Sequence, residues 1–181
     1  MNRFDQLERV SLPRDIPQPA QPVRGNAFDS NVYRTLNKPR CRVSRTTTLA
    51  IANNGQTVTF DAAAEYDTDS LYAGSTTKIS ITTTGLYDVS GYILHDTASA
   101  AGAGRGGWIL KNGVTTTRYG QDNQAPSTTR SITNFPRDEM ILNAGDYVEL
   151  FAFQDSGASR DIVSNSGLPA AKLSLTFLSS I

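Results

Sequence analysis

Cysteine is almost absent from this chain, and so are long apolar runs. Cys41 is the single cysteine among 181 residues, so no disulfide can form within the chain. Such cysteine usage is typical of a protein made in a reducing cytoplasm. No apolar run approaches the roughly 18 residues that a membrane-spanning helix needs, and the first residues lack the apolar stretch of a secretory signal. We therefore expect that the protein is made in the cytoplasm and does not insert into a membrane. If it acts outside the cell, it leaves by assembly into a particle or by cell lysis.

Catalytic motifs are lacking as well. His95 is the only histidine, which excludes a histidine-rich metal site, and no serine stands in a nucleophile-elbow pattern. Residues 102–107 match the glycine spacing of a dinucleotide-binding loop, but a strand rather than a helix is expected to follow, so we interpret them as a loop tip. Asp67, Asp69 and Asp155 are potential calcium ligands, although turn capping is the commoner use of such aspartates. The sequence therefore predicts no enzyme, no catalytic residue, no cofactor and no metal site.

Charge is unevenly distributed although the formal net charge is zero. Residues 1–45 carry nine Lys and Arg against four Asp and Glu, whereas residues 46–181 carry eight against thirteen. Two of the N-terminal cations, Arg40 and Arg42, flank Cys41 and would lower the pKa of an accessible thiol, although a lone cysteine is more often structurally incidental. A basic N-terminal segment is typical of a tail that contacts an acidic partner, and a solvated tail without a partner is the alternative. The remaining cations are scattered among acids, so no nucleic-acid binding is predicted.

Proline is concentrated in the N-terminal segment, where five of the eight prolines occur before residue 40. Proline fixes φ and removes a backbone donor, so residues 1–42 are predicted to form an extended arm instead of a helix or a central strand. The large apolar side chains of this arm are too sparse to form a core of their own. We interpret four of them as anchors that become ordered on a partner, with a simple linker as the alternative: Phe4, Leu7, Leu12 and Phe28.

From residue 43 onward, apolar residues alternate with polar ones, as Leu173 and Leu175 do near the C-terminus. Asn112-Gly113 stands between two such runs and favours a type I′ hairpin turn. Residues 147–154 are apolar at both alternating sets of positions, as in a strand with the core on one side and a subunit contact on the other. Short strands separated by turn signals, without helical periodicity, predict an all-β sandwich or barrel.

Three elements of this pattern resemble the globular head of the complement C1q/tumour-necrosis-factor family. They are Gly85 with Tyr87, the Asn112-Gly113 turn, and the Gly-Asp turn that precedes Tyr147. Phe60 followed by Asp67 and Tyr72, and a terminal alternating strand that ends near Phe177, add to the resemblance. The resemblance covers residues 43–181 and implies a ten-stranded jelly-roll sandwich that forms a homotrimer. It also implies that the Gly-x-Tyr element and the Gly-Asp strand form the inner sheet around the three-fold axis. Core or trimer-interface positions are thereby implied for five residues: Tyr87, Val89, Tyr147, Phe151 and Phe153.

The resemblance is closest to heads found in phage and bacterial structural proteins, and together with the arm it implies a phage virion structural protein. In this hypothesis a trimeric capsid decoration or head-fibre protein attaches to other virion proteins (capsid, collar or tail) through residues 1–42. Its knob then stabilises the shell or adheres to a host surface. A tail-fibre or tail-tip receptor-binding knob is the alternative, and a secreted lectin-like adhesion module is an alternative of another class. Recognition, including contact with host-surface glycan, is expected in the polar loops: residues 53–55, 98–107, 121–129 and 155–166.

Overall fold

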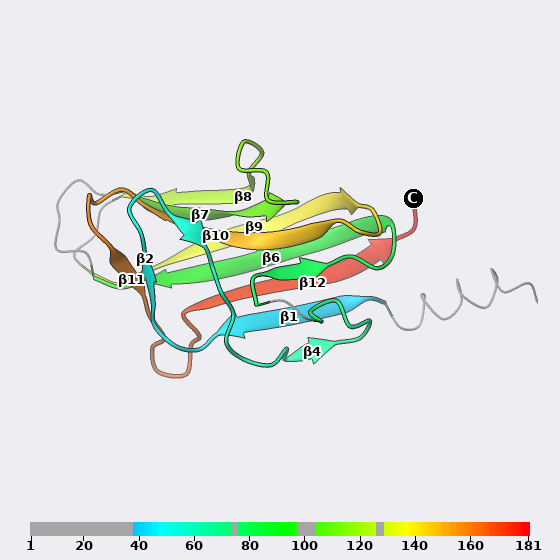
Figure 1. Ribbon diagram of the computed structural model, residues 1–181, viewed down its shortest axis with the longest axis horizontal. Helices are drawn as coiled ribbons and strands as arrows, with labels where there is room; N and C mark the ends of the chain where they lie inside the picture. The colour runs from blue at the N-terminus through cyan, green and yellow to red at the C-terminus, as the bar shows by residue number, and fades with distance from the viewer. Residues whose placement is uncertain (1–37, 74–75, 98–103, 126–128) are drawn as a thin grey trace, which may run out of the picture.

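The computed structural model describes residues 38–73, 76–97, 104–125 and 129–181, which form a sandwich of strands (Figure 1). This part of the chain holds twelve strands and no helix, and therefore no helix that is long and apolar enough to cross a membrane. The four predicted anchors, Phe4, Leu7, Leu12 and Phe28, lie outside the described residues. The strands are β1 (Arg40–Arg45), β2 (Leu49–Ile51), β3 (Gln56–Thr57), β4 (Tyr66–Asp67), β5 (Lys78–Ser80), β6 (Gly85–His95), β7 (Arg105–Lys111), β8 (Tyr119–Gln124), β9 (Ser131–Leu142), β10 (Tyr147–Gln154), β11 (Arg160–Ile162) and β12 (Ala171–Ser179).

The larger sheet has seven strands in the order β2-β11-β6-β12-β1-β4, with β9 also paired to β6. β6 is its central strand, because β12 lies along one edge of β6 and β9 along the other, both antiparallel. β1 extends the sheet on β12, from the pair Arg40↔Thr176 to the pair Arg45↔Ala171. The sheet therefore includes residues from Arg40 onward, although the alternating pattern becomes visible in the sequence only at residue 43.

The smaller sheet has five strands in the order β3-β10-β7-β8, with β5 also paired to β10. β10 pairs with β7 from Val148↔Lys111 to Gln154↔Arg105. The predicted turn after β7 is confirmed, because Asn112 and Gly113 have φ angles of 53° and 69° and the Val114 amide donates to the Lys111 carbonyl at 3.1 Å. β8 resumes only at Tyr119, so a further irregular segment follows the turn before the hairpin closes.

The two sheets enclose one apolar core. Side chains at every second position of the central strands point into it, and Tyr87, Val89, Leu173 and Leu175 are all fully buried there. This confirms the predicted all-β jelly-roll sandwich. Ten strands were expected and twelve are present in the described residues. The two shortest, β3 and β4, have two residues each, which is too few for an alternating pattern to be visible in the sequence.

Two predictions about local structure were wrong. Residues 105–107 belong to β7 and are buried, so only the part of the glycine-rich segment before them can be a loop. β6 and β10 lie in different sheets, so the Gly-x-Tyr element and the Gly-Asp strand do not form one inner sheet. The chain crosses from one sheet to the other at the turn before β10, where Gly145 donates its amide to the Ile81 carbonyl at 2.8 Å.

Candidate recognition surface

The sandwich has two distinct ends, which Figure 1 shows at the two sides of the view. At one end β1 begins beside the end of β12, where the Phe177 amide donates to the Pro39 carbonyl at 2.8 Å and Lys38 Nζ donates to the Leu178 carbonyl at 3.2 Å. We call this the arm end. β6 starts there and runs for 11 residues, about 35 Å, to His95 at the opposite end, the far end. The two ends are thus separated by the length of the sandwich.

Polar connections gather at the far end. Asn53 Oδ1 accepts from the Gly157 amide at 2.8 Å, so the connection between β2 and β3 lies against the one between β10 and β11. Asp155 Oδ1 accepts from the Gly104 amide at 2.5 Å, so the residues before β7 lie against the same connection. The described parts of the predicted recognition loops are therefore brought together by the fold, although they are far apart in the sequence.

An ion pair links the connection between β8 and β9 to the one between β6 and β7 at this end. Arg130 Nε lies 3.0 Å from Asp96 Oδ1, which links the residues before β9 to those after β6. Partial burial alone would raise the pKa of Asp96, but the Thr97 amide and Arg130 outweigh it and lower the pKa. The predicted loop residues 98–103 and 126–128 lie outside the described residues.

A layer of buried polar side chains closes the core beneath the far end. Arg105 and Gln154 contribute from the five-stranded sheet and His95 and Thr133 from the seven-stranded sheet, with partly buried Ser131 beside them. Arg105 and His95 are each only 3% exposed and Gln154 is 2% exposed. Sequence analysis did not find this polar layer, because nothing in the sequence indicates that these side chains, at the ends of alternating apolar runs, are buried.

Most members of the polar layer are well bonded. Gln154 Nε2 donates to the carbonyls of Ile51 (3.1 Å) and Ala158 (2.7 Å), and Arg105 Nη1 lies 3.4 Å from Ser131 Oγ. The layer therefore links the two sheets to the far-end connections by hydrogen bonds. The positions of these connections consequently depend on the layer.

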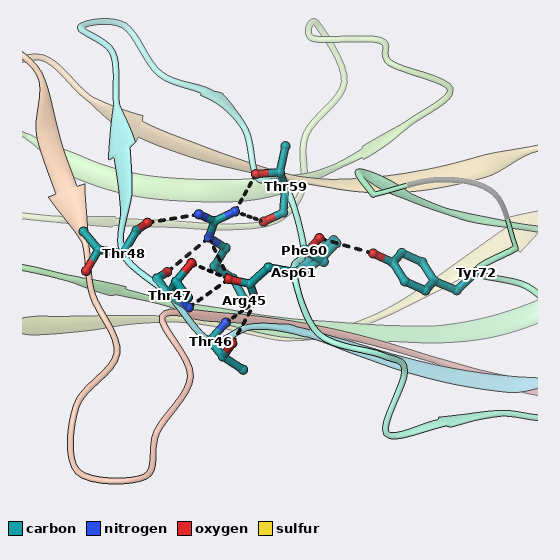
Figure 2. Close-up of polar contacts among 8 residues, drawn as sticks. All are labelled: Arg45, Thr46, Thr47, Thr48, Thr59, Phe60, Asp61 and Tyr72. Atoms are coloured by element: carbon teal, nitrogen blue, oxygen red, sulfur yellow. Dashed lines mark hydrogen bonds and ion pairs between the residues drawn. The ribbon is translucent and has the colours of Figure 1, made fainter.

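A second polar cluster holds the connection between β1 and β2 (Figure 2). Asp61 accepts from the amides of Thr46 and Thr47, at 2.6 and 2.9 Å, and also from both of their hydroxyls. Arg45 donates to Thr59 Oγ1 at 2.8 Å and to the Thr48 carbonyl at 3.0 Å. This network has a structural role: it holds the connection between β1 and β2 in place. The neighbouring groove of about 320 Å³, along residues 164–169, is lined by hydroxyl, amide and apolar groups and offers no titratable side chain for chemistry.

The five predicted interface or core residues fall into two groups. Tyr87 and Val89 are fully buried in the core of the single chain. Tyr147, Phe151 and Phe153 alternate with buried residues of β10 and lie half-buried on the outward face of the five-stranded sheet. There Phe151 stacks on Trp108 with ring centroids 4.8 Å apart.

Cations cover much of this aromatic face. The Arg118 guanidinium lies 4.0 Å from the centroid of the Trp108 ring, and Lys78 Nζ lies 4.5 Å from that of Tyr147. Trp108 is consequently only 3% exposed although it points outward. The aromatic side chains of the five-stranded sheet are thus packed against one another within one chain.

The outward face of the seven-stranded sheet is different, and sequence analysis did not single it out. Ile141 and Ile132 of β9 are 56% and 36% exposed. On neighbouring β6, the Tyr92 hydroxyl and Asp88 Oδ1 are buried without a hydrogen-bond partner. Exposed isoleucines beside buried polar atoms that lack partners are typical of a surface that another protein covers.

Four of the nine Lys and Arg residues in 1–45 lie in β1 or just before it. Arg42 lies 3.5 Å from Glu65, Arg45 lies 3.5 Å from Asp61, and Arg40 and Arg42 both lie over the Tyr66 ring. Without these three and Lys38, residues 1–37 carry five cations against four acids. The excess of cations in the N-terminal segment therefore comes largely from residues 38–45, where the arginines of β1 hide its alternation.

Two candidate chemical groups have structural roles. Cys41 is fully buried, and burial, with a smaller contribution from Asp67, raises its pKa to about 12, so Arg40 and Arg42 do not activate the thiol and Cys41 is a structural residue. Asp67 accepts from the amides of Leu71 and Tyr72 at 2.7 and 3.0 Å, as a turn-capping residue does. No group of three or more His, Cys, Asp or Glu that could hold a metal occurs in the described part of the chain.

Comparison with known proteins defines the class of fold. No family model and no curated protein sequence matches this chain. Among solved structures, the globular domain of zebrafish complement 1qA protein has a TM-score of 0.60 and 14% identity, and the match covers 80% of this chain and all of that chain. The match to murine APRIL (TM-score 0.55, 13% identity) covers 78% of this chain and 99% of that chain. The match to Eiger TNF from S. frugiperda (TM-score 0.52, 12% identity) covers 80% of this chain and 95% of that chain. The chain therefore has a C1q/TNF-like jelly-roll fold.

Proposed function

We propose that this chain is a phage virion structural protein: a trimeric capsid decoration or head-fibre protein with a C1q-like head. One observation carries the proposal. The point at which residues 1–37 join the head and the cluster of polar connections lie at opposite ends of a rigid sandwich. A head held at its arm end necessarily directs its far end away from whatever holds it.

Assembly strengthens such an attachment. A trimer has three copies of the N-terminal segment, and when the first is bound the others bind at a high effective concentration, which raises avidity by orders of magnitude. The outward face of the seven-stranded sheet, with Ile132, Ile141 and the unpartnered Tyr92 hydroxyl, supports contact between copies. The protein acts by binding and not by catalysis, and its site of action is the virion, after synthesis in the host cytoplasm.

The same geometry suits a tail-fibre or tail-tip knob, which would present the far end to a host receptor such as a surface glycan. The polar character of Asn53, Asp96 and Asp155 supports this alternative. The two roles differ in where on the particle the arm is held, which can be tested by locating the protein on purified virions by electron microscopy.

Removal of residues 1–37 tests the attachment. Because Arg40 pairs with Thr176 in β1, this deletion leaves every strand intact, whereas a longer one would damage the sheet. We expect the shortened protein to fold and assemble as the full chain does but to be lost from purified particles. Full-length protein with Asn53→Ala at the far end is the matched control and should remain attached. Copurification of the shortened protein with particles would contradict anchoring by the arm.

A further inference from the structure

The polar layer beneath the far end contains the only histidine of the chain. His95 is the last residue of β6, where it pairs with Ser131 of β9 on one side and Ile162 of β11 on the other. Its side chain points into the core, in line with fully buried Ile93. Three strands of the seven-stranded sheet thus meet at this side chain, and each of them leads into a connection of the far end.

The surroundings of His95 favour a neutral imidazole. The ring is hydrogen-bonded to the backbone of Gly106, and its other nitrogen, Nε2, is buried without a partner. Burial, and then the positive charge of Arg105, lower the pKa of His95 to about 4, against the smaller opposite effect of the Gly106 bond. A proton on this ring would place a second buried cation beside Arg105. Among the described residues, no carboxylate is bonded to the imidazole to offset that charge.

We propose that His95 and Arg105 form a proton-sensitive latch, which opens the far end of the sandwich at mildly acidic pH while the arm end stays folded. Opening exposes the imidazole to water, where it accepts a proton, and separates it from Arg105. The described residues between β6 and β7 (96–97 and 104) and those just before β9 then lose their common support. This inference concerns the fold alone and holds whatever the far end binds.

The charged groups around His95 come from neighbouring strands. Arg105 faces His95 from β7, and Arg160 of β11 adds positive charge near Arg105. Asp96 follows His95 directly but is ion-paired with Arg130, which holds its pKa below the usual value. Asp96 therefore stays ionised until the solution is more acidic than the range in which His95 responds, so a change between pH 7 and pH 5 belongs to the histidine.

The direction of the pH effect follows from the lowered pKa. The closed form binds fewer protons than the open form, so its stability is complete above the ordinary imidazole pKa and declines as the pH falls below it. With a pKa of 6.5 in the open form and about 4 in the closed form, the open fraction rises about twentyfold between pH 7 and pH 5.

Hydrogen exchange of the full chain, read by mass spectrometry, tests the latch. We expect the protection of peptides covering residues 91–97 and 104–109 to fall about twentyfold from pH 7 to pH 5, after correction for the intrinsic pH dependence of exchange. Peptide 85–89, at the arm end of β6, is the internal reference and should not change. His95→Gln keeps a donor for the Gly106 carbonyl but does not titrate, so its far end should show the same protection at both pH values.

The imidazole itself provides a second measurement, in case His95→Gln fails to fold. Because the chain has one histidine, its ring gives a single set of proton resonances. Exposure of the far end that follows the titration of this ring supports the latch. Exposure while the ring stays neutral, an equal pH response in His95→Gln, or unchanged protection between pH 7 and pH 5 would each overturn it.

Discussion

At the scale of single residues, one carboxylate organises the connection between β1 and β2. Asp61 accepts four hydrogen bonds from Thr46 and Thr47, and its partner Arg45 binds Thr59 from the other side (Figure 2). Partial burial alone would raise the pKa of Asp61, but these donors outweigh it and lower the pKa to about 2. An ionised acceptor is thus built into the fold.

Asp61→Asn should therefore cost about 1 kcal/mol of unfolding free energy at pH 7, a modest figure because the site is in contact with solvent. The folded pKa is lowered, so the stabilisation by the wild-type carboxylate is present above pH 4 and is lost as the pH falls toward about 2. Urea denaturation at both ends of this range measures it, with exposed Asp161→Asn as the control. A loss that is equal at neutral and at acidic pH would show that charge is not the cause.

At the scale of elements, the start of β7 depends on glycine for close packing. A Cβ on Gly107 would lie 2.6 Å from the Phe151 carbonyl oxygen and 2.7 Å from both Ile93 and Phe135. Atoms of both sheets therefore lie so close to Gly107 that a side chain would not fit, and glycine lets the strand pass between them.

Gly107→Ala should destabilise the protein by about 2–3 kcal/mol, because backbone and core atoms would have to move. Gly104→Ala is the matched control: its Cβ would meet only Asp155, at an ordinary 3.5 Å, and the change should be below about 0.5 kcal/mol. Chemical denaturation of both variants gives the comparison. If the two variants were equally stable, close approach at Gly107 would not be the reason for glycine there.

At the scale of the whole molecule, the proposed trimer requires one of the two outward faces as the contact between copies. The aromatic residues of the five-stranded sheet are already covered in part, Trp108 by Arg118 and Tyr147 by Lys78, whereas Ile141 on β9 is 56% exposed. The seven-stranded sheet therefore gains more apolar burial from a partner. Its outward face holds two unpartnered polar atoms, the Tyr92 hydroxyl and Asp88 Oδ1, whereas the five-stranded face holds one, Trp108 Nε1, among the described residues.

Light scattering of the full chain should give about three times the chain mass of 19.6 kDa. Ile141→Asp should reduce this to the mass of one chain without unfolding it, because the side chain is exposed in a single chain and a buried unpaired charge at a contact costs several kcal/mol. Val114→Asp, 46% exposed on the segment after β7, is the control and should remain a trimer. If Ile141→Asp stays trimeric and Phe151→Asp does not, the contact lies on β10; a monomeric wild type would contradict the trimer itself.

The sequence by itself determined the class of fold and the direction of most core side chains. Alternation placed Leu173 and Leu175 inward, and Asn112-Gly113 set a turn, because both signals are local consequences of strand geometry and of positive φ. Such local signals do not say which strand lies beside which. Arg42 faces Ser174, and Asn53 meets Gly157, across more than a hundred residues. Only the tertiary structure decided that β6 and β10 lie in opposite sheets, that the loops share one end, and that His95 is buried beside Arg105, because these depend on contacts between distant segments.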